Sequence, residues 1–154
     1  MPSIMIVEDN DFFRRSFKEI LKMYIPSLRV EESADGSDIL AKISGSLPDM
    51  IFMDIRLPGK SGLELTREIK GLYPDQVITI FTSCDHPEYR RIARECGADH
   101  FLLKDSLTGA EIAAMVQKEA RRVGKAKPAT RGGRVPEKAG RRSNRTGSAT
   151  TSAP

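Results

Sequence analysis

The sequence has little of what marks secreted, membrane or disulfide-bonded proteins. Only two of its 154 residues are cysteines, and Cys84 and Cys96 have neither metal-ligand nor redox-motif spacing, so we expect reduced thiols. No apolar run approaches the ~18 residues that a membrane span needs. The first residues, MPSIMIVEDN, lack the basic segment of a secretory signal. Together these absences predict a cytoplasmic protein without a membrane span.

Charge is distributed unevenly along the chain. The formal net charge is +4, yet residues 1–123 carry 17 basic and 20 acidic side chains, whereas residues 124–154 carry eight basic and one acidic. The second segment is rich in Gly, Pro, Ser, Thr, Ala and Arg, and Val135 is its only large apolar residue. Such a composition buries too little apolar surface to offset the entropy of ordering, which predicts a disordered basic tail over 124–154.

Short apolar runs alternate with amphipathic segments throughout residues 1–123. The runs typical of strands are 3–7, 28–33, 50–53, 77–81 and 100–103, and the segments with helical spacing are 11–25, 36–46, 61–73, 87–97 and 106–123. Five strand–helix units in strict alternation predict one α/β domain, a doubly wound parallel sheet with helices on both faces. Periodicity leaves the strand order open, and the flavodoxin-like order 2-1-3-4-5 is one of two common choices.

Polar residues stand directly after the predicted strands. They are Glu8 and Asp9 after the first strand, Asp54 after the third, Thr82 and Ser83 after the fourth, and Lys104 after the fifth. Open parallel sheets bind ligands outside the carboxyl ends of their strands, so we expect these side chains to converge. Three close carboxylates repel one another, and Mg²⁺, which prefers oxygen ligands, would supply the counter-charge. A cation, a lysine and a hydroxyl around one carboxylate favour phosphoryl transfer onto that carboxylate.

Several separated segments resemble the signature segments of two-component response-regulator receiver domains. They are IMIVEDN, IFMDIRLPGKSGLEL, TIFTS and GADHFLLKD, in the order and spacing of that family, and the resemblance covers residues 2–123. Glu8 in the acidic pair and the segment FLLKD are similar to receivers of NarL/LuxR-type regulators. The resemblance implies the five-stranded flavodoxin-like fold with strand order 2-1-3-4-5, and a receiver domain spanning residues 1–123.

The resemblance also implies a phosphorylation site and a metal site. Asp54 is the expected phosphoacceptor. Mg²⁺ is expected on Asp9, on Asp54, on the backbone carbonyl of Arg56 and, through water, on Glu8. The expected phosphodonor is a sensor histidine kinase or a phosphotransfer protein. Apart from self-phosphotransfer and autodephosphorylation at Asp54, no enzymatic activity is implied.

A second group of residues is expected to sense the phosphoryl group. Thr82 and Lys104 would bind its oxygens, and the position of Ser83 is compatible with phosphate access. Phe101 matches the aromatic residue that turns inward as Thr82 moves toward the phosphate, with an ordinary core position as the less favoured alternative. This movement would change the surface formed by the fourth helix, fifth strand and fifth helix, and so the binding of an unknown downstream protein or of a second copy in a homodimer.

The output of the chain stays open. NarL/LuxR-type relatives carry a helix-turn-helix domain after the receiver, but residues 124–154 show no apolar periodicity and are too few to form one. We therefore expect output through protein partners, with a truncated DNA-binding regulator as an alternative. A second alternative is nonspecific binding of nucleic acid or an anionic surface by the basic tail. The tail has no aromatic residue for base stacking, which argues against single-strand specificity.

Overall fold

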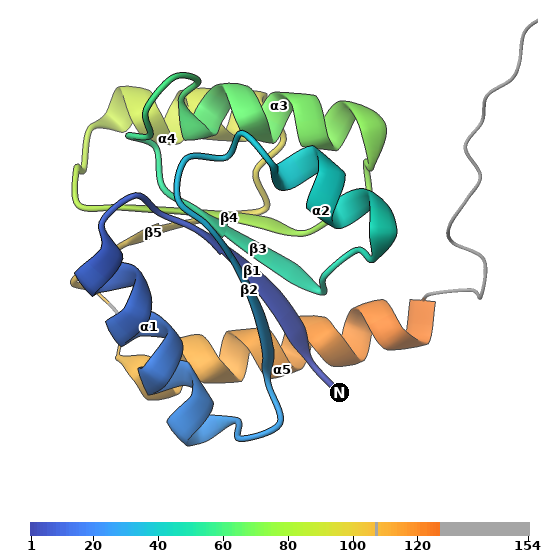
Figure 1. The fold of residues 1–154 in the computed structure, drawn as a ribbon. Helices are drawn as coiled ribbons and strands as arrows, with labels where there is room; N and C mark the ends of the chain where they lie inside the picture. The colour runs from blue at the N-terminus through green and yellow to red at the C-terminus, as the bar shows by residue number, and fades with distance from the viewer. Residues whose placement is uncertain (107, 127–154) are drawn as a thin grey trace, which may run out of the picture. The chain divides into compact units, whose positions relative to one another are not determined.

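The computed structural model describes residues 1–106 and 108–126 (Figure 1). The chain divides into two units, Met1–Val123 and Gly124–Pro154. The sequence predicts disorder from residue 124, but residues 124–126 still belong to the last helix, and from residue 127 onward the predicted tail lies outside the described residues. Among the residues that are described, no helix combines the length and the apolar content that crossing a membrane requires.

The first unit contains a five-stranded parallel sheet. Its strands are β1 (Ser3–Val7), β2 (Arg29–Ser33), β3 (Met50–Met53), β4 (Ile78–Thr82) and β5 (His100–Leu103). They lie in the order β2-β1-β3-β4-β5, which confirms the predicted flavodoxin-like topology. In this register Met53 pairs with Val7 on one side and with Ile80 on the other, so the carboxyl ends of the three central strands lie side by side.

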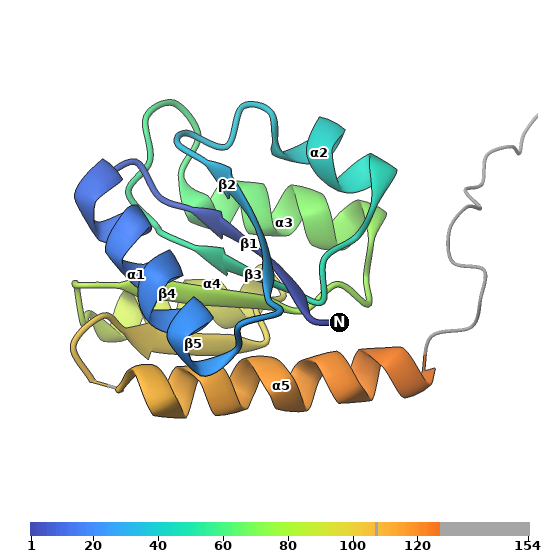
Figure 2. The same cartoon turned by 60° about the horizontal axis from the view of Figure 1, so that its bottom comes forward.

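Five helices cover the two faces of the sheet. They are α1 (Asp11–Tyr24), α2 (Ile39–Gly45), α3 (Gly62–Leu72), α4 (Pro87–Glu95) and α5 (Gly109–Ala126). Helices α1 and α5 lie on one face, and α2, α3 and α4 lie on the other (Figure 1). The view of Figure 2, turned to bring α5 forward, shows the same division. This doubly wound arrangement leaves the carboxyl edge of the sheet to the loops.

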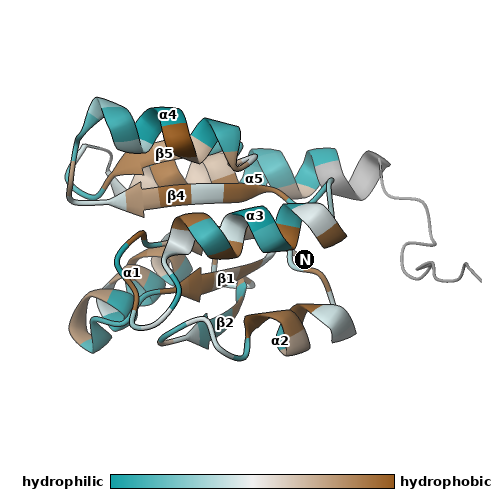
Figure 3. Ribbon diagram, turned by 90° about the horizontal axis from the view of Figure 1, so that it is seen from above, coloured by the Kyte–Doolittle hydropathy of each residue, from teal (hydrophilic) through white to brown (hydrophobic). Residues whose placement is uncertain are grey.

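The strands supply side chains to both helix layers. Ile4 and Ile6 pack with residues of α1 and α5, whereas Met5 and Val7, next to them in sequence, pack with residues of α2 and α3. All residues of β3 and β4 are buried, as strands covered on both faces must be. Figure 3 shows the result, with strands β1 and β4 in brown and the outward turns of α4 largely in teal. The continuous apolar runs of the sequence are thus explained by two cores.

Two helices begin later than the periodicity predicts. Helix α2 begins at Ile39 instead of residue 36, because Gly36 has a φ of +80° and donates its N–H to Ser33 Oγ at 3.0 Å, which makes a turn. Helix α5 begins at Gly109 instead of residue 106. Just before it, Thr108 and Glu111 each accept the other's backbone N–H, at 3.1 and 2.8 Å, which fixes the first turn of that helix.

Candidate functional site

The three acids predicted to meet do meet at the carboxyl edge of the sheet. Glu8, Asp9 and Asp54 each place one carboxylate oxygen within 4.8 Å of the others. Glu8 and Asp54 are only 1% and 6% exposed, whereas Asp9 is exposed to solvent. The backbone fixes this approach, because the Asp54 N–H donates to the carbonyl of Val7 at 3.0 Å. Two buried carboxylates and one exposed carboxylate therefore share one small site.

Lys104 brings a positive charge into the same site. Its ammonium donates to Glu8 Oε1 at 2.6 Å and lies 3.8 Å from Asp54 Oδ1. Lys104 directly follows β5, and its backbone N–H donates to the Thr82 carbonyl at 2.9 Å, which anchors the residue beside β4. One ammonium faces three carboxylates, so the site keeps an excess of negative charge.

The excess of negative charge shows in the behaviour of Asp54. Burial raises the pKa of the Asp54 carboxyl to about 6, and the nearby charge of Glu8 acts in the same direction. Lys104 and the backbone N–H of Ile55, which donates to Asp54 Oδ1 at 3.0 Å, only partly oppose this rise of the pKa. Asp54 is therefore mostly ionised at neutral pH, with its charge incompletely balanced.

The donor set suits a hard divalent cation. All three side chains offer oxygen, which is what Mg²⁺ prefers, and the exposed position of Asp9 keeps the site open to water ligands. An added cation would also relieve the repulsion that raises the Asp54 pKa. The expected fourth ligand, the carbonyl of Arg56, remains a prediction.

The hydroxyl and loop residues lie at the same edge but are engaged elsewhere. Thr82 is buried at the end of β4, and its Oγ1 accepts the N–H of Cys84 at 3.3 Å. Ser83 is exposed. The side chain of Arg56 is exposed too, and its Nη2 lies 3.7 Å from Cys84 Sγ. The structure thus places Thr82 at the same edge of the sheet as the acids, and its hydroxyl is hydrogen-bonded to the loop that follows β4.

Phe101 belongs to β5 and stands three residues before Lys104. It is partly buried in β5, opposite Ile80, and packs against the core under α2, α3 and α4. The guanidinium carbon of Arg90 lies 4.7 Å from the centre of its ring, and Arg90 is held in turn by Asp85, with Nε and Oδ1 3.1 Å apart. Phe101 is therefore neither fully core nor fully exposed.

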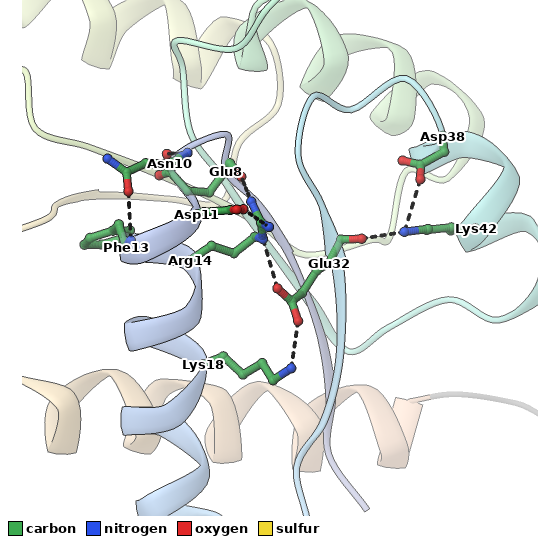
Figure 4. Close-up of polar contacts among 9 residues, drawn as sticks. All are labelled: Glu8, Asn10, Asp11, Phe13, Arg14, Lys18, Glu32, Asp38 and Lys42. Carbon is green, nitrogen blue, oxygen red and sulfur yellow. Dashed lines mark hydrogen bonds and ion pairs between the residues drawn. The ribbon is translucent and has the colours of Figure 1, made fainter.

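Arg14 is a structural neighbour of Glu8 that reasoning from the sequence missed. Its Nη1 donates to the Glu8 carbonyl at 2.6 Å, and its Nε donates to Glu32 Oε1 at 2.9 Å (Figure 4). Lys18, one turn further along α1, donates to Glu32 Oε2 at 2.7 Å. The bond from Lys18, with that from Arg14, lowers the pKa of Glu32. This network ties the turn that carries Glu8 to β2, and the four-residue spacing of two cations on α1 was its only signal.

Gly62 is a second residue whose importance the sequence did not reveal. A Cβ atom at this position would lie 1.9 Å from the carbonyl oxygen of Asp54. The first turn of α3, capped by reciprocal hydrogen bonds between Ser61 and Glu64, therefore packs directly on the Asp54 backbone. A glycine is required because no other residue allows two backbone segments to approach so closely.

Comparisons with known proteins agree with this arrangement. The family model of the response regulator receiver domain matches residues 4–117. The uncharacterized transcriptional regulatory protein YxjL of Bacillus subtilis (strain 168) is 32% identical over 104 residues, which are 68% of this chain and 48% of YxjL. The chain spans about half the length of the curated relatives that it matches first.

Solved structures show the same fold. The receiver domain of the putative response regulator NarL from Mycobacterium tuberculosis is 29% identical, with a TM-score of 0.70, and the match covers 78% of this chain and 96% of that one. A structure described as the BeF3-activated DrrB receiver domain is 25% identical, with a TM-score of 0.69, and the match covers 79% of this chain and 99% of that one.

Proposed function

Because the chain belongs to the response regulator receiver domains of two-component systems, we propose that it is switched by phosphorylation of Asp54. One observation carries the proposal: the buried Asp54 carboxylate ends the central strand β3 within reach of Glu8, Asp9 and Lys104. Receiver domains are signalling domains rather than classical enzymes. Self-phosphotransfer and autodephosphorylation at Asp54 are accordingly the only reactions that we propose for this chain.

The reaction begins with Asp54 as nucleophile. One carboxylate oxygen forms a bond to the phosphorus of a phosphohistidine, the P–N bond breaks, and the released imidazole takes up a proton. The product is an acyl phosphate on Asp54. Since the pKa of Asp54 is raised to about 6, the nucleophilic form of the carboxylate is reached only as the pH rises through that value. Hydrolysis of the acyl phosphate returns the site to its starting state.

The neighbours of Asp54 balance the charge that arrives. The Lys104 ammonium lies 3.8 Å from the carboxylate, and a small movement would bring it to a phosphoryl oxygen. Thr82 would exchange its bond with the Cys84 N–H for one donated to the phosphoryl group. Mg²⁺, held by Asp9, Asp54, the Arg56 carbonyl and, through water, Glu8, would neutralise charge on the transferring oxygens. Ser83 leaves the approach open because it is exposed and small.

The switch follows from the movement of Thr82. When its hydroxyl turns toward the phosphoryl group, Phe101 turns inward from its present place beneath Arg90. The surface of α4, β5 and α5 then changes, and with it the affinity for a downstream protein or a second copy of the chain. The phosphodonor in this proposal is a sensor histidine kinase or phosphotransfer protein, and the location is the cytoplasm.

The assignment of Asp54 can be tested by phosphorylation with acetyl phosphate and Mg²⁺. We expect the wild-type chain to gain one phosphoryl group in an intact-mass measurement and Asp54→Asn to gain none. Asp49→Asn is the matched control, because Asp49 precedes the amino end of the same strand and its Oδ2 accepts the N–H of Ser3 at 2.9 Å. Mg²⁺-dependent phosphorylation of Asp54→Asn would sink the proposal.

The switch can be tested separately with beryllofluoride, the ligand named for the DrrB structure. Addition of Mg²⁺ and beryllofluoride should shift the backbone amide resonances of Thr82, Phe101 and α4, and chelation of Mg²⁺ should reverse the shifts. If only resonances close to Asp54 shift, the assignment of Asp54 as phosphoacceptor would stand, but the proposed switch through Thr82 and Phe101 would be wrong.

A further inference from the structure

The ammonium of Lys104 has two aromatic neighbours in addition to its two carboxylates. Its Nζ lies 4.4 Å from the centre of the Phe13 ring and 5.4 Å from that of Phe81. The same atom is bonded to Glu8 at 2.6 Å and approaches Asp54 to 3.8 Å. Only 15% of the Lys104 side chain is exposed. Ring faces and carboxylates therefore replace most of the water that a lysine ammonium would otherwise hold.

The Phe13 ring is itself fixed in place. Its centre lies 5.6 Å from that of Phe81 and 5.9 Å from that of Phe17, against which it stacks. Its backbone N–H donates to Asn10 Oδ1 at 2.9 Å, and Asn10 in turn donates its N–H to Glu8 Oε2 at 2.9 Å (Figure 4). The first turn of α1 thus sets the positions of both the Glu8 carboxylate and the Phe13 ring. Both lie against Lys104.

An aromatic ring suits this place for a physical reason. The negative face of the ring attracts a cation but offers no lone pair that would occupy an N–H of the ammonium. The ring therefore restrains the flexible four-carbon side chain of the lysine and leaves the N–H groups of the ammonium free to donate to carboxylate or phosphoryl oxygens. A water molecule would do the opposite, accepting a hydrogen bond and imposing no fixed position.

We propose that Phe13, together with Phe81, is a positioning residue for phosphoryl transfer: the rings hold the Lys104 ammonium between Glu8 and Asp54. This inference rests on the proposed role of Asp54 as phosphoacceptor. Phe13 acts only through Lys104 and touches no reacting atom. Of the two rings Phe13 is the better one to alter, since it is partly exposed whereas Phe81 is fully buried in β4.

The test compares Phe13→Leu with Phe17→Leu. Phe17 is the matched control because it belongs to the same helix and the same aromatic cluster, is more deeply buried, and stacks on Phe13. With acetyl phosphate and Mg²⁺, we expect Phe13→Leu to lower the rate of phosphorylation and the affinity for beryllofluoride about threefold to tenfold, which lies within the range of a cation–π contact. Phe17→Leu should lower the thermal stability more than Phe13→Leu does, but should lower the rate of phosphorylation by less than about twofold. Phe13→Tyr, which keeps an aromatic ring, should have the wild-type rate.

Two further measurements separate positioning from a general loss of packing. In a Lys104→Met background, Phe13→Leu should cause no additional loss of the remaining rate. The ε-methylene protons of Lys104 should resonate upfield because of the ring current in the wild type and in Phe17→Leu, and should return toward ordinary values in Phe13→Leu. These resonances report on the lysine whether or not Asp54 takes phosphate.

Clear results would overturn the inference. They are an unchanged rate in Phe13→Leu, equal losses of rate in the two leucine variants, additive losses in the Lys104→Met background, or ordinary ε-methylene shifts in the wild type. If Asp54→Asn is still phosphorylated, the proposed function fails instead, and the resonances of Lys104 still decide whether Phe13 holds the lysine in place.

Discussion

The two edges of the sheet carry the same kind of residue and treat it differently. At the amino edge, Asp49 accepts the N–H of Ser3 at 2.9 Å, and Asp99 accepts the N–H of Ile78 at 2.9 Å and lies 3.1 Å from the ammonium of Lys70. At the carboxyl edge three acids crowd together with one lysine. Each acid of the first edge completes the backbone hydrogen bonding of a strand.

The difference shows how a carboxylate that supports a fold can be told from one that is available for chemistry. Asp49 and Asp99 each accept the N–H of a strand residue and thereby stabilise the neighbouring backbone. Asp54 is buried, lies close to another carboxylate and is only partly paired, so its ionised form is destabilised and its pKa is raised. Substitutions at the two edges should therefore have opposite effects on stability.

The largest expected effect comes from Gly62, which allows α3 to pack on the Asp54 carbonyl. Gly62→Ala would place a methyl group 1.9 Å from that oxygen, and we expect a loss of about 3 kcal/mol in the free energy of unfolding together with weaker phosphorylation. Gly71→Ala on the same helix is the control, since its added Cβ meets no atom within 4 Å and should stabilise the fold by up to about 1 kcal/mol. Urea unfolding measures both changes. Equal stability of the two variants would contradict the close packing.

The next effect concerns the charge of Asp54 in metal-free buffer. Folding raises its pKa to about 6, so the folded state binds more protons than the unfolded state between about pH 4 and pH 6. The Asp54 carboxyl therefore contributes most to stability below about pH 4, and this contribution is lost as the pH rises to about 6. Asp54→Asn should remove this loss and raise the free energy of unfolding at pH 7.5 by about 2 kcal/mol.

The measurement is urea unfolding in the presence of a chelator across that pH range. Asp49→Asn serves as the reference variant and should keep the wild-type pH dependence. A variant Asp54→Asn with an unchanged pH profile would mean that another group causes the loss of stability.

A smaller effect of opposite sign is expected at the amino edge. Asp99→Ala removes the acceptor of the buried Ile78 N–H and the partner of Lys70, which should cost about 1–2 kcal/mol. Unlike Asp54→Asn, this variant should be phosphorylated at the wild-type rate. Thermal unfolding and intact-mass labelling of the two variants side by side would test the contrast between the edges. A more stable Asp99→Ala would erase that contrast.

The smallest effect is that of Mg²⁺ itself. At about five times its dissociation constant, a cation that binds only the folded chain should add about 1 kcal/mol to the free energy of unfolding. We expect this gain in the wild type and in Asp99→Ala, and little or none in Asp9→Asn, which lacks the solvent-exposed carboxylate of the site. Titration of the melting temperature with Mg²⁺ measures it. An equal gain in all three chains would place the cation elsewhere.

The sequence predicted most of the sheet because the patterns of β1, β3 and β4 are determined by local burial. Their continuous apolar runs match strands covered on both faces, and the acids that follow β1 and β3 mark the carboxyl edge. The strand order was predicted from the family resemblance, because periodicity does not indicate which strands are neighbours in the sheet. The predicted starts of α2 and α5 were wrong because a turn at Gly36 precedes α2 and the capping hydrogen bonds between Thr108 and Glu111 set the start of α5.

Other features depend on distances that no local pattern contains. Phe13 was predicted only as part of a helix, and its contact with Lys104 joins residues at opposite ends of the domain. Gly62 was predicted only as part of the helical segment 61–73, although the Asp54 carbonyl excludes a side chain there. The bond from Arg14 to Glu32 likewise joins α1 to β2. Such contacts arise from packing, which becomes visible only in three dimensions.

The bond between Lys104 and Glu8 means that the site carries its own covalently attached counterion. A tethered ammonium has an effective concentration set by the length of its side chain, so dilution, dialysis or chelation cannot remove it. Part of the negative charge at the carboxyl edge is thus balanced by Lys104 before any dissolved cation binds. Under the proposed function, a divalent ion that binds there would take over part of this role, and the Lys104 ammonium would shift toward Asp54, 3.8 Å away.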